Sequence, residues 1–319
     1  MRKKICVIGA GDWGKNHIKT LYRLNSLKGI VEVNNEVLES NLNIYPEVKG
    51  YPSVLDALKD NYDGFVIATP AKTHCKIAKT IISSNKPVLI EKPMALTIEE
   101  AKELVELSEK FNVNVLIGHV LLFHPAILKI KRIIDLGQIG ELQYIYSNRL
   151  NLGKVRTEEN VFWSFAPHDI AIFQYLTSST PQKINATGST FLQEGIPDST
   201  LMQLEYKNGI KGHIFVSWLH PFKEHRLVVI GSEAMISFED SLYDKPLKLY
   251  SKKIDLKSGL PEKIDGPVET IMYGNKMPLE AELEYFLEHL SGDKPKISNI
   301  YQGFDVVKIL VEATSQILG

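Results

Sequence analysis

Short apolar runs alternate with helical patterns over the first third of the chain. The apolar runs lie within residues 4–11, 29–33, 63–70, 87–93 and 113–119. Between them, apolar residues recur every three or four positions in 13–27, 54–60, 74–83 and 97–111, which predicts helices. Ser53 and Thr97 stand where N-caps are expected. This alternation predicts an α/β fold with a doubly wound parallel sheet.

The pattern changes after about residue 122. Period-two alternation predicts a strand at 142–152. An antiparallel pair is predicted at 200–206 and 210–218, with a hairpin turn at Asn208-Gly209, and 226–231 and 234–240 are expected to continue the sheet. Helical patterns occupy 125–136, 167–177, 279–290 and 303–318, and the polar stretch 240–268 is expected to be a loop excursion. We therefore predict a first domain over 1–122. A second, α+β domain with a large, mostly antiparallel sheet is predicted over 123–319, and its last helix could pack back on the first.

Composition narrows the class of protein. The 319 residues are 44% hydrophobic and 24% charged, with a formal net charge of -1 and no basic block, so nucleic acid and anionic membranes are not expected partners. Cys6 and Cys75 lie far apart, which fits a reducing compartment and argues against a disulfide framework. No apolar stretch approaches the roughly 20 residues of a transmembrane helix. We expect a cytoplasmic protein.

The segment "GAGDWG" follows the first predicted strand and opens the first helix. It fits the dinucleotide pattern G-x-G-x-x-G through Gly9, Gly11 and Gly14, with Asp12 and Trp13 between them. Glycines here permit a tight turn and close approach of a pyrophosphate to a helix N-terminus. The alternative is a turn that only packs strand on helix.

Glu32, near the end of the second strand, stands where an acid would bind the adenine ribose hydroxyls. Lys and Arg are absent from 31–38, so no cation is at hand for a 2′-phosphate, and we predict NAD over NADP. A solvated acid at a strand end is the alternative interpretation of Glu32.

Further candidates follow the third and fourth strands, at the carboxyl edge where open α/β sheets bind ligands. Thr69, Pro70 and His74 come from "ATPAKTH", although His74 could equally be an exposed residue of a first helical turn. The buried run of "VLIEKP" ends in an acid, a base and a proline, Glu91, Lys92 and Pro93, which are further candidates because packing rarely requires charges there.

The order of these motifs resembles the Gfo/Idh/MocA oxidoreductases. "VIATPAKTH", "VLIEKPMA" and Gly118-His119 carry the resemblance, which extends over the whole chain. It implies a Rossmann domain, a C-terminal domain with an open sheet, and hydride transfer between nicotinamide and a sugar or cyclitol carbon. The family's lysine maps onto Lys92, and Pro93 corresponds to a proline often preceded by a cis bond.

Lys92 and His168 are the predicted catalytic residues. Oxidation of a carbinol needs a proton acceptor and a donor to the oxygen, which Lys92 can supply; Glu91 could orient it or contact the nicotinamide ribose. Family members carry a histidine at the position of His168, commonly with an Asp four residues earlier, where this chain has Ser164. His168 is predicted to open a helix, with Asp169 orienting it or capping the helix. Which of the two takes the proton stays open.

A second stretch, "RLNLGKVRTEENVFWSFAPHDI", resembles the subgroup that oxidises the 3-hydroxyl of UDP-N-acetylglucosamine or its uronic acid before transamination. Arg149 and Arg156 could contact a diphosphate or carboxylate. Sugar hydroxyls or the acetamido group could be bound by Asn151 and Asn160, and Trp163 could stack on a sugar face. Ordinary structural roles are the alternative for each.

Other functions remain open at this point. One is a dehydrogenase or ketoreductase for a free sugar, inositol or another nucleotide sugar, and another is a non-catalytic NAD-dependent sensor. The histidines at 119, 124, 168, 213, 220 and 225 show no recognised zinc spacing, so no metal is predicted. The resemblance implies a homodimer or homotetramer assembled through the exposed face of the C-terminal sheet.

Overall fold

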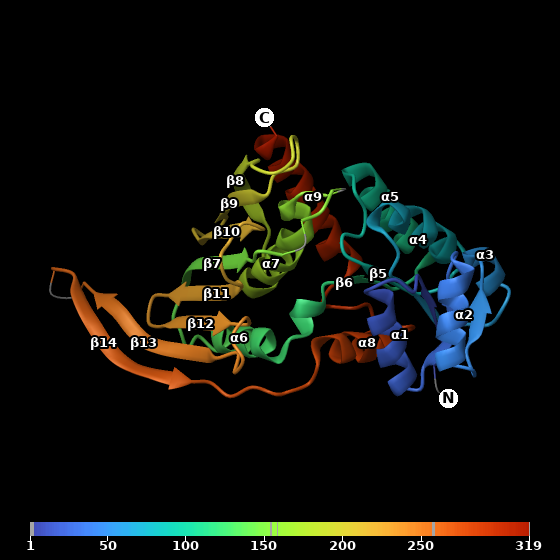
Figure 1. Ribbon diagram of the computed structural model, residues 1–319. Helices are drawn as coiled ribbons and strands as arrows, with labels where there is room; N and C mark the ends of the chain where they lie inside the picture. Colours follow the sequence, from blue (N-terminus) through green and yellow to red (C-terminus); the bar gives the residue numbers. More distant parts are fainter. Residues whose placement is uncertain (1–2, 154, 158, 257–258, 319) are drawn as a thin grey trace. The chain divides into compact units, whose positions relative to one another are not determined.

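The computed structural model describes residues 3–153, 155–157, 159–256 and 259–318 (Figure 1). The chain forms two compact units. The first contains Met1–Phe123 and Met277–Lys308, and the second contains His124–Lys276 and Ile309–Gly319. The first crossing lies next to the predicted boundary at residue 122, whereas Met277–Lys308 returns to the first unit. Helix α9 (Ile300–Ile317) contributes residues to both.

Unit 1 contains a six-stranded parallel sheet in the order β3-β2-β1-β4-β5-β6. The strands are β1 (Ile5–Ile8), β2 (Leu27–Val31), β3 (Lys49–Tyr51), β4 (Gly64–Ile67), β5 (Val88–Glu91) and β6 (Val115–Gly118). This is the strand order of dinucleotide-binding Rossmann folds, so the predicted doubly wound sheet is confirmed. Pattern reasoning missed β3 and the helix before it, α2 (Asn35–Ile44).

The helices of unit 1 are mostly those that the pattern predicts. They are α1 (Gly14–Arg23), α2, α3 (Val54–Ala57), α4 (His74–Ser83), α5 (Ile98–Phe111) and α8 (Pro278–Glu288), with 3-10 turns η1 (Ala71–Thr73) and η2 (Val120–Phe123). Ser53 and Thr97 accept hydrogen bonds from Asp56 N and Glu100 N, as N-caps do. The α8 residues Leu283 and Phe286 complete the core beside the sheet.

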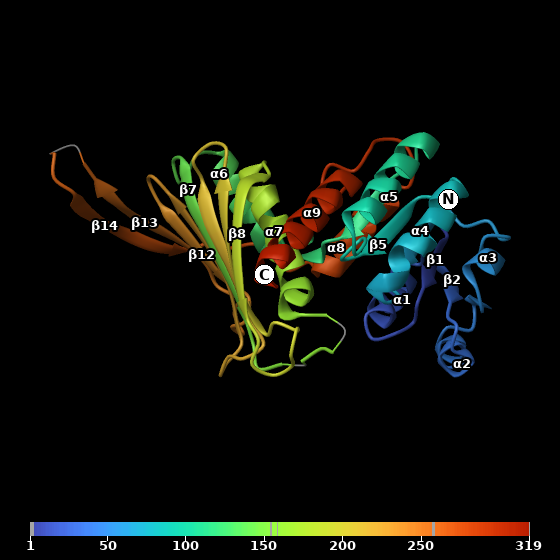
Figure 2. The same ribbon diagram turned by 90° about the horizontal axis from the view of Figure 1, so that it is seen from above.

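Unit 2 contains an eight-stranded sheet in the order β14-β13-β12-β11-β7-β10-β9-β8. Its strands are β7 (Leu142–Leu150), β8 (Pro181–Ser189), β9 (Ser199–Tyr206), β10 (Lys211–Ser217), β11 (Glu224–Gly231), β12 (Met235–Glu239), β13 (Leu247–Asp255) and β14 (Glu262–Thr270). Only the β7–β10 pair among them is parallel. Helix α7 (Val161–Thr177) packs on β7, β9 and β10 and on α6 (Pro125–Asp135), along one face of the sheet (Figure 2).

Two local predictions for unit 2 are wrong. The expected loop over 240–268 contains most of the β13–β14 hairpin, whose lysine- and acid-rich strands lack a clear apolar period. The helix expected to start at Pro167 starts at Val161, because Asn160 caps it by accepting from Trp163 N. Pro167 therefore lies inside α7. The predicted Asn208-Gly209 turn is confirmed: it joins antiparallel β9 and β10, with Gly209 at φ +84°.

No helix in the described ranges is both long enough and apolar enough to cross a membrane.

Candidate active site

Glycines shape the loop between β1 and α1. Gly9 has φ +94°, and a Cβ there would lie 2.8 Å from the Ala68 carbonyl oxygen. A Cβ on Gly14 would lie 2.0 Å from the Gly9 carbonyl oxygen. A Cβ on Gly11, by contrast, would meet no described protein atom within 4 Å. Packing thus requires Gly9 and Gly14, whereas Gly11 fits the role of the glycine that lets a pyrophosphate approach the backbone.

Glu32 follows the last residue of β2 and is partly buried. Its carboxylate accepts hydrogen bonds from Ala10 N at 2.8 Å and from Asn34 N at 3.0 Å. The acid is therefore held beside the glycine loop, where the ribose of a dinucleotide lies in this fold. Asp12 and Trp13, at the tip of the same loop, are exposed.

Glu91 joins the glycine loop to the end of β5. Its carboxylate accepts a hydrogen bond from Trp13 Nε1 and contacts His17 Nε2 at 2.6 Å, and its second oxygen accepts from Lys92 N at 3.2 Å. Burial raises the pKa of Glu91, but His17, Trp13 and the Lys92 charge outweigh it and hold that pKa below its ordinary value. Glu91 is therefore a buried anion built into the cofactor side of unit 1.

Lys92 is partly buried, and its peptide bond to Pro93 is cis, as the resemblance implied. Next to it, His74 is buried rather than exposed, and its two ring nitrogens face the Pro93 and Thr69 carbonyl oxygens at 2.8 and 2.7 Å. His74 thus fixes the Thr69-Pro70 turn against the turn that carries Lys92. This position suits a residue that supports a cofactor site from behind.

Three more titratable residues of unit 1 belong to this region, and sequence reasoning gave none of them a role. They are His17, His119 and Glu282, each almost completely buried. Burial and the Lys92 charge lower the pKa of His119 to about 4. Gly118, just before it, allows Glu91 to fit, since a Cβ there would lie 2.9 Å from the Glu91 carboxylate.

In unit 2, a buried ion pair ties β7 to α7. Arg149 Nε and a terminal nitrogen donate to the two Asp169 oxygens at 2.8 and 3.1 Å. Burial lowers the pKa of Arg149, but Asp169 outweighs it and raises that pKa above its ordinary value. His225 lies beside the guanidinium, and burial together with the Arg149 charge lowers its pKa to about 3. Asp169 thus neither caps a helix nor lies at one's start; it anchors the turn that presents His168.

The remaining candidates of unit 2 surround the start of α7. Asn160 is the N-cap, and Trp163 is held through Nε1, which donates to Thr314 Oγ1 at 2.8 Å. Asn151 follows β7 and is partly exposed, and Arg156 lies exposed with Glu159 3.7 Å away. His168 is partly buried in the middle of α7. The side-chain oxygen of Asn160 and the ring N–H of Trp163 therefore have structural roles. The Arg156 side chain is exposed.

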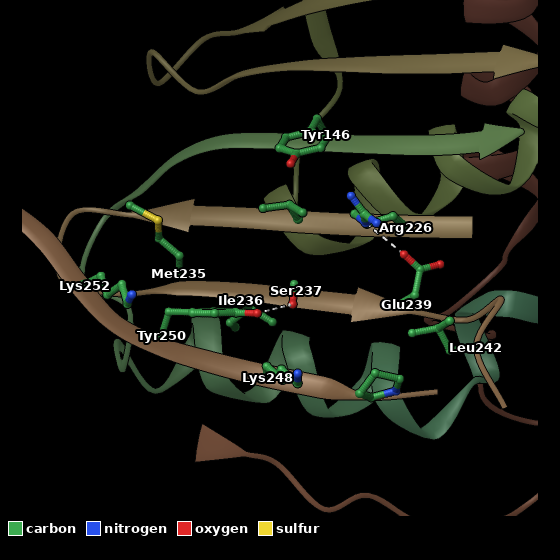
Figure 3. A pocket seen from close by; sticks show the side chains of 12 residues that line it. Tyr146, Arg226, Met235, Ile236, Ser237, Glu239, Leu242, Lys248, Tyr250 and Lys252 are labelled. Carbon is green, nitrogen blue, oxygen red and sulfur yellow. Dashed lines mark hydrogen bonds and ion pairs between the residues drawn. The ribbon is translucent and has the colours of Figure 1, made fainter. Parts of the chain in front are cut away.

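A separate cavity of about 420 Å³ lies on the sheet of unit 2, lined among others by Tyr146, Arg226, Ser237 and Tyr250 (Figure 3). None of the predicted site residues lines it. No cluster of three or more potential metal ligands occurs in the ranges that the structure describes.

A Rossmann sheet, a G-x-G-x-x-G loop and an acid after β2 together define a dinucleotide-binding protein. Comparison with known proteins extends this. Residues 3–119 match the oxidoreductase family with an NAD-binding Rossmann fold, and residues 127–237 match the GFO/IDH/MocA C-terminal domain. The chain belongs to the Gfo/Idh/MocA family of NAD-binding oxidoreductases.

Among relatives, the chain is 25% identical over 317 residues to UDP-N-acetylglucosamine 3-dehydrogenase of Acidithiobacillus ferrooxidans, covering 97% of each chain. It is 26% identical over 250 residues to scyllo-inositol 2-dehydrogenase (NAD(+)) of Bacillus subtilis, covering 73% of this chain and 72% of that protein.

Solved structures show the same fold. The Acidithiobacillus enzyme superposes with a TM-score of 0.86 at 23% identity, covering 100% of this chain and 98% of that chain. The WlbA dehydrogenase of Bordetella pertussis, solved with NADH and UDP-GlcNAcA, superposes with a TM-score of 0.79 at 17% identity, covering 99% and 97%.

The position of Glu32 predicts a cofactor preference. Wild-type protein should bind NAD at least about tenfold more tightly than NADP, since a carboxylate accepts from ribose hydroxyls and repels a 2′-phosphate. Glu32→Gln should narrow that ratio, while Glu36→Gln, an exposed neighbour on α2, should leave it unchanged. Titration of both cofactors by fluorescence measures this. A clear wild-type preference for NADP would remove Glu32 from this role.

Proposed function

We propose that this chain oxidises the 3-hydroxyl of a UDP-N-acetylhexosamine, UDP-N-acetylglucosamine or its uronic acid, to the 3-keto sugar with NAD. A transaminase would then use the keto sugar to make a 3-amino sugar. The observation that carries the proposal is the similarity to UDP-N-acetylglucosamine 3-dehydrogenase, which spans 97% of both chains rather than the Rossmann part alone.

The residues of unit 1 fit NAD. Gly11 leaves room beside the backbone, the start of α1 offers N–H groups to a pyrophosphate, and Glu32 can accept from the ribose. Thr69, Pro70 and Glu91 lie at the same carboxyl edge of the sheet. His74 contacts the carbonyl oxygens of Thr69 and Pro93 and so fixes the turns at that edge. Bound there, NAD would accept the hydride from the sugar.

The proton chemistry is assigned to Lys92 and His168. A lysine directly after Glu91 can donate to the carbinol oxygen or accept its proton, and the imidazole of His168 is the second candidate acceptor. Asp169, which follows His168 in sequence, already accepts two hydrogen bonds from the Arg149 guanidinium. We therefore assign Arg149 to positioning α7. The diphosphate is then assigned to Arg156, and sugar contacts to Asn151, Trp163 and the amide nitrogen of Asn160.

The second candidate is a dehydrogenase of a free sugar or inositol. The similarity to scyllo-inositol 2-dehydrogenase, at about the same identity over a shorter span, favours it. The two candidates differ in whether unit 2 recognises a nucleotide diphosphate.

The predicted homodimer or homotetramer stays a prediction. The sheet face that carries Tyr146, Met235 and Tyr250 supports it, because it offers apolar and aromatic side chains around the cavity of Figure 3.

A thermal-shift screen separates the two substrates. With NAD present, UDP-N-acetylglucosamine or its uronic acid should raise the melting temperature by a few degrees at saturation, because ligand binds only the folded state. Inositol and free N-acetylglucosamine should not. Absence of a shift with every UDP-N-acetylhexosamine would eliminate the leading substrate.

Lys92→Ala should lower turnover of the responding sugar by roughly 10²–10⁴-fold, the range of general acid–base catalysis, while NAD affinity persists. Lys102→Ala, an exposed lysine on α5, is the matched control and should retain normal turnover. Steady-state kinetics with cofactor titration measures both. Near-normal turnover of Lys92→Ala would refute its assignment.

The pH–rate profile of His168→Asn distinguishes the two proton acceptors. An unchanged profile would exclude the histidine.

A further inference from the structure

Glu282 is a buried acid that the proposed chemistry does not use. It lies on α8 with no exposed surface, and neither carboxylate oxygen has a hydrogen-bond partner among the described residues. Burial, and then the negative charge of Glu91, raise the pKa of Glu282 well above its ordinary value. A leucine or methionine of similar volume would fill this place without the cost of burying an acid. Such a residue in a Rossmann unit points to a function.

Glu282 belongs to a group of buried titratable residues that Glu91 links across four elements of unit 1. Helix α8 packs on α1 and η2. Glu91, at the end of β5, is the charge that acts on Glu282. His17 on α1 contacts the Glu91 carboxylate at 2.6 Å, and His119, between β6 and η2, feels the charges of Glu91 and Lys92. On α8 itself, Glu280 pairs with Arg23.

Several of these polar atoms lack a partner. In the described part of the chain, none is found for His17 Nδ1 or for either His119 nitrogen, in addition to both Glu282 oxygens. Buried polar atoms in proteins almost always have a partner, either a protein group or ordered water. These five atoms belong to the three residues that contact Glu91 or are affected by its charge. This part of unit 1 is therefore a polar site that can hold and move protons rather than an ordinary core.

The charge of the cofactor links this site to the reaction. The nicotinamide ring is positive in NAD and neutral in NADH. Glu91 stands at the sheet edge where NAD is proposed to bind, so a positive ring there favours an ionised carboxylate. When that charge disappears, two neighbouring acids repel each other more strongly, and one of them binds a proton more tightly.

We propose that Glu282 and Glu91 together form a proton-binding site whose affinity rises when the cofactor is reduced, so that it takes up the proton released from the substrate alcohol. The inference rests on the proposed function. In the balanced step, the carbinol C–H bond breaks and its hydride passes to NAD. The hydroxyl proton passes through Lys92 to the carboxylate pair. The products are the ketone, NADH and one carboxylic acid, which later returns its proton to water.

Cofactor affinities measured against pH test this without any substrate. For the wild type, the ratio of the Kd for NAD to the Kd for NADH should rise as the pH falls, by up to about tenfold per pH unit, because the reduced complex binds the extra proton. Glu282→Gln keeps the shape but cannot ionise, so its ratio should hardly change. Glu288→Gln, an exposed acid on the same helix, should behave as the wild type.

A ratio that does not depend on pH in the wild type, or one with the same slope in Glu282→Gln, would overturn the inference. Failure of both cofactors to bind at any pH would instead overturn the proposed function, and the inference with it.

Calorimetry of the wild type in buffers of different ionisation heat gives a measurement that needs no variant. Binding of NADH should take up more protons than binding of NAD, and equal proton uptake would contradict the proposal.

Thermal unfolding of the cofactor-free protein provides an independent readout. The native pKa of Glu282 lies above its unfolded value, so the native state binds the proton more tightly and loses stability as pH rises between the two values. Glu282→Gln avoids this loss. Its melting temperature should match that of the wild type in acid and exceed it increasingly towards alkaline pH. A difference that does not vary with pH would show that the native protein does not bind a proton at Glu282 more tightly than the unfolded chain does.

Discussion

The hydrogen bonds to the Glu91 carboxylate hold the cofactor side of unit 1 together. Trp13, at the tip of the glycine loop, donates to this carboxylate, and His17, on the first turn of α1, contacts it. The backbone N–H of Lys92 donates to its second oxygen. Hydrogen bonds to an ionised group contribute about 1.5–3 kcal/mol each. One buried anion therefore fixes the loop that would bind the pyrophosphate and the lysine that would face the sugar.

Unit 2 uses the same kind of interaction for a different purpose. The two-point pairing of Arg149 with Asp169 joins the middle of α7 to β7, and breaking a buried pair of this kind typically costs about 3–5 kcal/mol. His168 precedes Asp169 directly, so the pair fixes the helical turn from which His168 projects. The charged pair of Arg149 and Asp169 therefore anchors this part of α7.

Sequence alone predicted the features that depend on local patterns. Buried strands, the caps at Ser53 and Thr97, the glycine loop and the acid at Glu32 all follow from short-range chemistry. The start of α7 was mistaken because Pro167 resembles a first-turn proline, while the true cap, Asn160, lies seven residues earlier. The β13–β14 hairpin was missed because its lysine- and acid-rich strands have no apolar period, and β14 is mostly exposed. Glu282 and His17 could not be found this way, since their neighbours on β5 lie far away in sequence.

The NAD affinity of Glu91→Gln tests the central claim most directly, namely that the Glu91 carboxylate organises the cofactor site. Glutamine keeps the shape but removes the charge that His17 and Trp13 bind. The account predicts a folded protein whose affinity for NAD falls by about tenfold or more, the equivalent of one lost charge-assisted hydrogen bond. Glu99→Gln, an exposed acid on the first turn of α5, should bind NAD as the wild type does. Unchanged NAD affinity in folded Glu91→Gln would contradict the account.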